Sequence, residues 1–263
     1  MKFQKISIMK VLGLILARKG SKGLRNKNIK KLDGYSLVEW SIIAGLESKL
    51  IDKIILSSDY SEKKLGNLAS NFYWKRPSEL AGDKVLSYNV IKDILKNKKL
   101  KFKPSYIVLL EPPCPFRNGK LVDKAIELAF EKKASSVVSL KKVEDSHPIR
   151  MKKLSKNLMI KSFLFDEPKK GIPRQKQETA FLRDQAVYVL HSDNFLKRQP
   201  TLYGSKAFGF KNDKISTNID NQIDYEFAKF LLKNKKKYKN LVMPNAKFFY
   251  KNENVIKKKV FLK

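Results

Sequence analysis

Short apolar segments alternate with amphipathic segments along the first 140 residues, and this alternation restricts the fold more than any other feature of the sequence. The apolar segments are rich in β-branched and aliphatic residues, as buried strands are, and they cover residues 11–17, 53–58, 106–110 and 136–140. The amphipathic segments have helical spacing and cover residues 37–47, 62–70, 85–95 and 121–130. Strands that alternate with helices predict an α/β fold with a doubly wound, mostly parallel sheet. Ligands of such sheets bind beyond the carboxyl ends of the strands.

The regular pattern stops after the fourth predicted strand. Residues 141–182 are polar and charged, and prolines interrupt them, so we interpret this stretch as a hairpin arm that leaves the core. A strand over residues 186–190 and a helix over residues 223–232 follow, and the chain is very basic beyond that helix. The sequence therefore predicts one domain over residues 1–232 with the arm inserted, and a basic C-terminal extension over residues 233–263.

The 57 Lys and Arg residues exceed the 25 Asp and Glu residues by a net charge of +32, which raises the question of a nucleic-acid partner. Only eight of the basic residues are Arg, and Arg is preferred for bidentate contacts with phosphates and bases. Lysines spread over the whole chain are typical of a solvated surface, so we do not expect a nucleic-acid partner. The lysine runs at 233–239 and 257–259 are the best candidates for a nonspecific anion-binding surface. Because 42% of the residues are hydrophobic, a wholly disordered protein is also excluded.

The few cysteines and histidines remove several classes of site. Cys114 is the only cysteine, which excludes an internal disulfide, and together with His147 and His191 it has no spacing typical of a zinc site. Neither histidine lies in a nucleophile motif, and we expect Cys114 to be a buried thiol rather than a nucleophile. A membrane span needs about 20 apolar residues, and the longest clean run, residues 11–17, is much shorter. We therefore expect a soluble, cytoplasmic protein.

A glycine-bearing basic loop follows the first predicted strand. Its sequence from residue 16 to residue 28 is Leu-Ala-Arg-Lys-Gly-Ser-Lys-Gly-Leu-Arg-Asn-Lys-Asn. Gly20 and Gly23 permit close approach of the backbone to a ligand. Arg18, Lys22 and Lys27 add positive charge, so the segment suits a polyphosphate. It contains neither the G-x-x-x-x-G-K-[ST] pattern nor the G-x-G-x-x-G pattern, and the alternative is a basic surface turn.

This loop resembles the N-terminal signature of the acylneuraminate cytidylyltransferases, the CMP-sialic acid synthetases. Their pattern is approximately L-A-R-x-x-S-K-G-[LI]-x-x-K-N, and the chain matches all of it. The more A-R-x-x-S-T-R-L-like loop of the 3-deoxy-octulosonate cytidylyltransferases fits less well. Further family-like segments follow in the same order: Leu-Ser-Ser-Asp at 56–59, Arg-Pro-Ser-Glu-Leu-Ala-Gly-Asp at 76–83, Leu-Glu-Pro-Pro-Cys-Pro-Phe-Arg at 110–117, Pro-Arg-Gln at 173–175, Leu-Arg-Asp-Gln-Ala-Val-Tyr at 182–188 and Asn-Ile-Asp at 218–220.

The resemblance implies a reaction, a cofactor and partners. In this reaction the anomeric hydroxyl of a nonulosonic acid, an acidic nine-carbon sugar, attacks the α-phosphorus of CTP and gives a CMP-sugar and pyrophosphate. Such a transfer depends on in-line positioning and charge neutralisation, which Mg²⁺ and cationic side chains supply. The resemblance further implies a homodimer, in which the arm of one protomer reaches the site of its partner, and a role in supplying precursors of surface glycans.

The resemblance also implies roles for individual residues at positions that match the family pattern. The implied catalytic residues are Arg18, Lys22 and Asp220. The implied nucleotide-binding residues are Arg18, Ser21, Lys22, Gly23, Lys27, Asn28, Arg76 and Ser87. The implied sugar-binding residues are Glu111, Arg174, Gln175 and Tyr188, and the implied metal ligands are Asp220 and Asn218. The residues alone leave alternatives open, with Asp220 as a helix cap, Asp59 as a turn residue and Arg174 paired with an acid of the arm.

Four positions depart from the family pattern. Glu111 stands where the pattern has Gln, Pro113 where it has Thr, Asn218 where it has Asp, and Gln185 where Gly is common. Glu111 adds a negative charge where an acidic sugar is expected, so the identity of the sugar stays open. Asn218 leaves Asp220 as the single carboxylate of the metal site, and Mg²⁺ sites often use only one or two. The alternative functions are a 3-deoxy-octulosonate-type cytidylyltransferase and a catalytically degenerate basic protein that binds nucleotide or nucleic acid.

Overall fold

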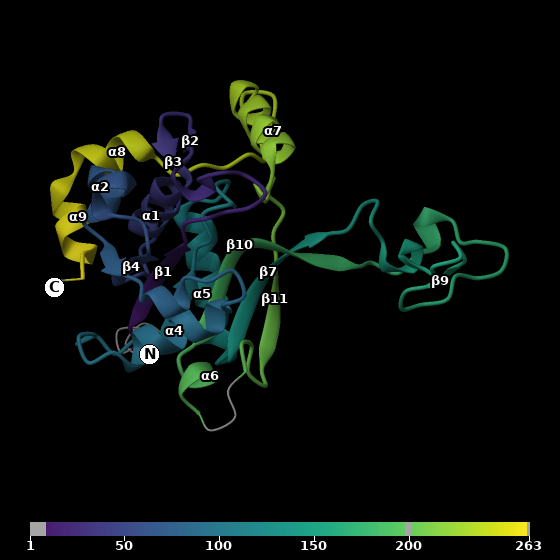
Figure 1. The fold of residues 1–263 in the computed structure, drawn as a ribbon, viewed down its shortest axis with the longest axis horizontal. Coiled ribbons are helices and arrows are strands. Elements are labelled where there is room, and N and C mark those ends of the chain that lie inside the picture. Colours follow the sequence, from purple (N-terminus) through teal and green to yellow (C-terminus); the bar gives the residue numbers. More distant parts are fainter. Residues whose placement is uncertain (1–8, 198–200, 262–263) are drawn as a thin grey trace.

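The computed structural model describes residues 9–197 and 201–261, which form a central seven-stranded sheet with helices on both faces (Figure 1). The strands are ordered β11-β7-β10-β6-β1-β4-β5. Their bounds are Val11–Ala17 for β1, Lys53–Ser58 for β4, Tyr73–Lys75 for β5, Tyr106–Leu109 for β6, Ser136–Lys142 for β7, Phe181–His191 for β10 and Ala207–Lys211 for β11. Neighbouring strands are parallel except at β10, which runs antiparallel to β6 and β7. The sheet is thus mostly parallel, as the sequence predicts.

The described residues form the helices α1 (Leu37–Glu47), α2 (Glu62–Leu65), α3 (Asn67–Ser70), α4 (Ser87–Lys96), α5 (Gly119–Lys132), α6 (Asp193–Leu196), α7 (Gln222–Lys233), α8 (Ala246–Lys251) and α9 (Glu253–Lys259). The short helices α6, α8 and α9 are not predicted by the sequence analysis, and the predicted helices begin and end close to their predicted bounds, with one exception. A single helix over residues 62–70 is wrong, because Gly66 has a φ of 86° and separates α2 from α3. Within the two described ranges, no helix has both the length and the apolar character that a membrane crossing requires.

Strand β1 is buried on both faces, which explains its nearly continuous apolar sequence. Val11 and Ile15 pack in the layer that contains α1 and α5. Leu12 and Leu14 point to the opposite face and pack in the layer that contains α4 and α6. The first charged residues after β1, Arg18 and Lys19, therefore lie in the loop beyond its carboxyl end, where ligands of such sheets bind.

The chain between β7 and β10 leaves the core as a long arm that projects from one side of the molecule (Figure 1). The arm carries a small antiparallel hairpin of β8 (Lys152–Leu154) and β9 (Ile160–Ser162). It exposes large apolar side chains, namely Met151, Leu154, Leu158, Met159, Ile160, Phe163, Leu164 and Phe165. Exposed apolar surface of this kind is typical of an interface. The predicted protruding arm is therefore present, and its role in dimerisation stays a prediction.

The basic segment after α7 folds back onto the domain. Helices α8 and α9 lie beside α1, and Val260 forms a parallel β-bridge with Ile54 of β4 (Figure 1). Lys259 is buried, and its ammonium donates to the carbonyl oxygens of Gly45, at 3.2 Å, and Ser48 at the end of α1. Burial lowers the pKa of Lys259 to about 8. The C-terminal extension thus contacts the core, and a domain boundary at residue 232 stays a prediction from composition.

Candidate active site

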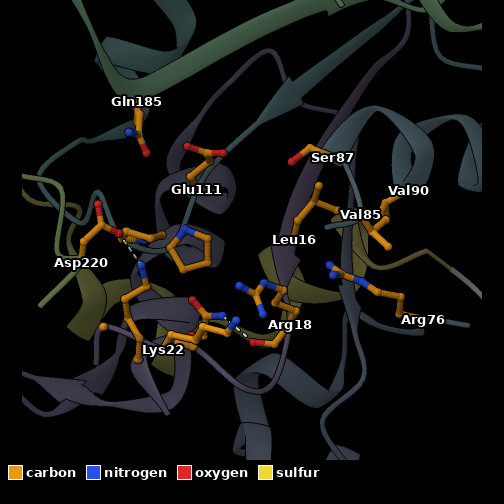
Figure 2. Close-up of a pocket in the computed structure, with 16 residues that line it drawn as sticks. Leu16, Arg18, Lys22, Arg76, Val85, Ser87, Val90, Glu111, Gln185 and Asp220 are labelled. Atoms are coloured by element: carbon orange, nitrogen blue, oxygen red, sulfur yellow. Dashed lines mark hydrogen bonds and ion pairs between the residues drawn. The ribbon is translucent and has the colours of Figure 1, made fainter. Parts of the chain in front are cut away.

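A cavity of about 450 Å³ opens at the carboxyl edge of the sheet, beyond the ends of β1, β5 and β6 (Figure 2). Its lining includes all the residues that the sequence assigns to nucleotide, together with Glu111 and Asp220. The nucleotide set is Arg18, Ser21, Lys22, Gly23, Lys27, Asn28, Arg76 and Ser87. These residues come from the loop after β1, the turn after β5 and the N-terminus of α4. The fold therefore brings segments that are far apart in sequence to one place.

The loop after β1 is held in shape by side chains at neighbouring positions. Asn28 is buried and donates from Nδ2 to the carbonyl oxygen of Arg18 at 2.9 Å. The backbone amide of Lys19 donates to Asp59 Oδ1 at 2.7 Å. Asp59, at the end of β4, therefore braces the loop. The loop has its shape before any ligand arrives, which lowers the entropy cost of binding.

Gly23 joins this loop to the segment that precedes α7. A Cβ atom at Gly23 would collide with the backbone carbonyl oxygen of Asp220. The close approach accompanies an ion pair of 2.7 Å between Lys27 Nζ and Asp220 Oδ1. Asp220 is not the cap of α7, because Asn221 fills that role in a capping box with Asp224. The helix-cap alternative is therefore wrong, and Asp220 lines the cavity.

Two cations of the loop share one acidic partner that the sequence analysis does not assign to the site. Asp83 Oδ2 lies 2.7 Å from Lys22 Nζ, and Asp83 Oδ1 accepts a hydrogen bond from Arg18 Nη1. The hydrogen bond from Lys22, reinforced by Arg18, lowers the pKa of the Asp83 carboxyl. Asp83 closes the family-like segment at 76–83, which is the signal that points to it. Such exposed pairs are weak, so a triphosphate competes well for the same cations.

One side of the cavity combines a buried cation with an apolar wall. Arg76 is only 5% exposed, and its Nη2 donates to the carbonyl oxygen of Ser57 at 2.9 Å. Burial lowers the pKa of Arg76. The apolar wall on this side consists of Leu16, which begins the loop motif, and of Val85 and Val90, which no sequence motif identifies (Figure 2). An apolar surface beside polar donors suits a nucleobase.

The other side of the cavity carries Glu111 and Gln185, whose side chains point into it close to one another (Figure 2). Burial raises the pKa of Glu111, and the Arg117 guanidinium opposes that shift. Arg117 is fully buried and donates to the carbonyl oxygens of Glu111, at 2.9 Å, and Ala186, at 3.1 Å. It therefore ties the loop after β6 to β10. This positioning role is absent from the sequence analysis, although Arg117 ends the family-like segment at 110–117.

Three of the predicted sugar-binding residues lie outside the cavity lining. Arg174 and Gln175 belong to the arm, where Arg174 Nη2 lies 2.6 Å from Glu144 Oε2. The alternative pairing of Arg174 with an acid of the arm is thus what the structure shows. Tyr188 is buried in β10, and burial, with a smaller contribution from Glu111, raises its pKa. The sugar roles of these three residues stay predictions.

The oxygen atoms near Asp220 allow a test of whether the site fits a divalent cation. Across residues 9–197 and 201–261, no group of three or more His, Cys, Asp or Glu side chains is arranged to hold a metal. Asn218 donates from Nδ2 to Asp220 Oδ2, while Asn218 Oδ1 is buried and has no hydrogen-bond partner in the described part of the chain. One carboxylate and one unpartnered amide oxygen fit Mg²⁺, which takes its other ligands from water and nucleotide phosphates.

The surroundings of Cys114 and His147 indicate structural roles for both residues. Cys114 is fully buried, and burial raises the pKa of its thiol to about 12, so it is not a nucleophile at neutral pH. His147 accepts a hydrogen bond from the amide of Ile149 at the start of a short 3-10 helix, and its Nε2 lies 2.8 Å from the carbonyl oxygen of Glu178. The expectation of a buried Cys114 thiol is confirmed.

Comparisons with known proteins identify the family. A family model described as cytidylyltransferase matches residues 12–256. The post-translational flagellin modification protein B of Campylobacter coli is 26% identical over 232 residues, which cover 86% of this chain and 96% of that protein. The CMP-N,N′-diacetyllegionaminic acid synthase of Campylobacter jejuni is 25% identical over 230 residues, covering 84% and 94%. The N-acylneuraminate cytidylyltransferase of Escherichia coli is 28% identical over 224 residues, covering 83% of this chain but only 51% of that relative, about half its length.

Solved structures share the fold. A CMP:2-keto-3-deoxy-manno-octonic acid synthetase complexed with CTP superposes with a TM-score of 0.61 and 12% identity, covering 86% of this chain and 99% of that one. A 4-diphosphocytidyl-2C-methyl-D-erythritol synthase from Anaerococcus prevotii gives a TM-score of 0.57 and 14% identity, covering 88% and 99%. At these identities the likeness concerns the fold alone, and it confirms the predicted α/β fold with a doubly wound, mostly parallel sheet.

Proposed function

The chain belongs to the cytidylyltransferase family, and on that premise we propose that it transfers CMP from CTP to a nonulosonic, sialic-acid-like sugar and releases pyrophosphate. One observation carries the proposal. The residues that the sequence assigns to nucleotide all line a single cavity, beside Asp220 and Glu111. Relatives named for N-acylneuraminate and for N,N′-diacetyllegionaminic acid support a sugar of this class.

The proposed reaction is an in-line displacement at phosphorus. The anomeric oxygen of the sugar forms a bond to the α-phosphorus of CTP, and the bond from that phosphorus to the oxygen bridging the β-phosphate breaks. Pyrophosphate leaves with the bonding electrons, and the hydroxyl proton passes to water. Negative charge develops on the bridging oxygen, so the site accelerates the reaction by holding both substrates and neutralising that charge.

The loop after β1 supplies the positive charge. Arg18, Lys22 and Lys27 all line the cavity. In the proposal the triphosphate replaces Asp83 as the partner of Arg18 and Lys22, because a polyphosphate carries more charge than one carboxylate. Gly23 keeps the loop backbone close to Asp220, so cations and carboxylate face the same phosphates.

The side of the cavity with Arg76 receives the cytidine in this proposal. Leu16, Val85 and Val90 offer an apolar surface to the base. Arg76 and the hydroxyl of Ser87, the first residue of α4, are the polar groups beside that surface. A few polar groups on an apolar wall fix the orientation of a ligand.

Mg²⁺ belongs to the proposal as well. When bound, it neutralises charge on the phosphates and helps to orient them. The Asp220 carboxylate and the buried Asn218 Oδ1, which has no partner among the described residues, would hold it. Lys27 pairs with Asp220 in this structure. In the proposal, Lys27 pairs with a phosphate instead when the Asp220 carboxylate holds the cation.

The sugar occupies the side with Glu111, across the cavity from Arg76 (Figure 2). Because Arg174 and Gln175 lie on the arm, we further propose a homodimer in which each arm supplies these residues to the partner's site. The exposed apolar side chains of the arm support this arrangement. We also propose that the enzyme acts in the cytoplasm and supplies precursors of surface glycans.

A 3-deoxy-octulosonate sugar is the second candidate substrate. The octulosonate synthetase shares the fold with this chain at 12% identity, which carries no information about the sugar. The basic loop fits the acylneuraminate signature better than the octulosonate one, so the nonulosonic sugar is preferred. A degenerate protein without turnover is the remaining alternative, and the same assay separates all three.

The test is a pyrophosphate-release assay with CTP, Mg²⁺ and a panel of sialic, legionaminic, pseudaminic and octulosonic acids. We expect release with CTP and a nonulosonic acid, and none with ATP or GTP. Lys22 has an exposed side chain, so Lys22→Ala tests the site without disturbing the fold. Lys19→Ala is the matched control, because Lys19 is exposed in the same loop but does not line the cavity. A folded protein that binds CTP and turns over no sugar would contradict the proposal.

A further inference from the structure

Gln185 has a backbone conformation that glutamine rarely adopts. Its φ is 60°, in the left-handed region that disfavours residues with a Cβ atom. It lies in a bulge of β10, where the register against β7 shifts between Arg183 and Tyr188. Bulges of this kind often lie beside active sites and re-aim a side chain. The bulge at Gln185 therefore sets the direction of its side chain.

Buried hydrogen bonds fix this conformation from one side. The carboxylate of Asp184 is buried and accepts from the amide of Ala186 at 3.1 Å and from Asn212 Nδ2 at 2.6 Å. It also accepts from the hydroxyl of Ser139, which in turn accepts from the amide of Val187 at 2.9 Å. Hydrogen bonds thus fix the residue before Gln185 and the two residues after it.

Arg117 fixes the conformation from the other side. Its guanidinium bonds to the carbonyl oxygen of Ala186 at 3.1 Å and to that of Glu111 at 2.9 Å. It therefore sets the position of the bulge relative to Glu111. Strained backbone persists only where its surroundings impose it, and it is enriched at functional sites. Here the surroundings impose it with two buried charged groups, Asp184 and Arg117.

The result of this arrangement is the direction of one side chain. Gln185 lines the cavity, and its carboxamide points into it near Glu111 and Asp220 (Figure 2). Figure 2 draws no hydrogen bond or ion pair from the Gln185 carboxamide or the Glu111 carboxylate to another of the residues shown lining the cavity. A donor-acceptor amide and an acceptor carboxylate therefore face the ligand space together.

We propose that Gln185 is a specificity-determining residue that recognises an acylamino substituent of the sugar. An acylamino group presents one N–H donor and one carbonyl acceptor. The Gln185 Nε2 donates to that carbonyl oxygen, and the Glu111 carboxylate accepts from that N–H. A hydroxyl carries its donor and its acceptors on one oxygen atom, so it has to meet both groups from a single point, whereas the acylamino group presents them on two separate atoms. This inference rests on the proposed function, since it names the sugar substituent that the same site selects.

The test compares two sugars that differ in one substituent, N-acetylneuraminic acid and its deaminated analogue with a hydroxyl in place of the acetamido group. The wild-type protein prefers the acetamido sugar in kcat/KM by about tenfold to a hundredfold, the range for losing one or two paired polar groups. Gln185→Gly removes the carboxamide and relieves the left-handed backbone. Its preference falls to within about threefold of unity, while the KM for CTP changes less than about twofold.

Stability separates this role from a structural one. Because glycine suits a positive φ, the Tm of Gln185→Gly stays equal or rises by about 2 °C. Lys133→Gly is the matched control, since Lys133 is exposed at the end of α5 with a φ of 47°. That variant changes the Tm in the same direction and leaves the preference for the acetamido sugar over the hydroxyl analogue unchanged. Gln185→Asn keeps a carboxamide and tolerates the backbone, so it regains part of the preference.

The outcomes are distinct. A wild-type protein that uses both sugars equally, or a Gln185→Gly variant that keeps the wild-type preference, would overturn this inference and leave the proposed function standing. A lower Tm of Gln185→Gly with an unchanged sugar preference would assign Gln185 to the fold instead. If the wild-type protein binds CTP but uses no nonulosonic acid at all, the proposed function fails and this inference falls with it.

Discussion

The two sides of the cavity are built in different ways. The proposed nucleotide side comes from segments that the central sheet holds, and its residues meet within one chain. The proposed sugar side has Glu111 and Gln185 from the core, whereas Arg174 and Gln175, which the family resemblance assigns to the sugar, lie on the arm outside the cavity lining, where Arg174 pairs with Glu144. A motif anchored at strand ends is assembled by the sheet itself. The position of a motif on an arm, relative to any site, depends on the surface that the arm contacts.

The largest expected effect concerns the anchored side. Gly23→Ala places a methyl group against the backbone carbonyl oxygen of Asp220, so the loop moves away from that segment. Small displacements of positioning groups are costly, and we expect kcat/KM to fall by about a hundredfold or more. Steady-state kinetics with CTP and the best sugar of the panel measure the loss.

Gly82→Ala is the control for that experiment. A Cβ at Gly82 meets Val85 Cγ2 at 3.7 Å, an ordinary contact, and Gly82 lies in the neighbouring segment. We expect its kinetics to match the wild type. Full activity in Gly23→Ala would show that the reaction does not need the close contact between the loop and the Asp220 segment. It would contradict the claim that the sheet assembles the proposed nucleotide side.

The second expected effect concerns the arm. If the arm serves the partner's site, Arg18→Ala damages the site of its own chain, whereas Arg174→Ala damages the site of the partner. Each variant alone is then nearly inactive. In a mixed dimer one site has both residues intact, so equal co-expression restores about a quarter of the wild-type activity.

Two results would break this part of the comparison. Wild-type activity of Arg174→Ala alone would remove Arg174 from the sugar site. Two inactive variants that show no recovery on mixing, although mixed dimers form, would place both residues in the same site. Size-exclusion chromatography with differently tagged copies establishes whether mixed dimers are present.

The sequence predicts the anchored side well for a physical reason. Strand and helix periodicity fix the sheet, and the sheet edge then gathers any loop that follows a strand, so Arg18 and Arg76 meet although they are far apart in sequence. Contacts between distant segments leave no local pattern. The ion pair of Arg18 with Asp83 and the burial of Arg117 are of that kind.

The bulge at Gln185 escaped the sequence analysis for a different reason. Residues 186–190 read as a plain strand, and only the departure from a common Gly marks the position. The hydrogen bonds beside its left-handed backbone join the preceding residue, Asp184, to Ser139 of β7 and to Asn212 after β11, which are distant in sequence. Gly66 shows the converse case, since a local glycine ends α2, although the periodicity of residues 62–70 favours one continuous helix.

The smallest expected effect concerns the C-terminal segment, which lies outside the family-like motifs and packs on the core. Burial lowers the pKa of Lys259 in the folded protein from 10.5 to about 8. Between these two pH values the unfolded chain binds the proton and the folded chain does not, so stability rises with pH across this window. Below the folded pKa the cost of the buried charge is constant.

Urea unfolding at pH 7.5 and pH 10 checks this prediction. Relative to Lys259→Met, the wild-type protein gains on the order of 1–3 kcal/mol of unfolding free energy at the higher pH. Lys257→Met is the control, because Lys257 is exposed and pairs only with Glu253 at 3.2 Å among the residues described. Equal pH dependence in all three proteins would show that Lys259 is solvated and that the segment does not clamp the end of α1.

The position of bound CTP decides whether the sheet edge is the nucleotide site. In a crystal structure with CTP and Mg²⁺, we expect the triphosphate to contact Arg18, Lys22 and Lys27, the pair between Arg18 and Asp83 to be broken, and the base to lie on the side of Arg76. A nucleotide bound away from the loop after β1, with Asp83 still on Arg18, would contradict this arrangement.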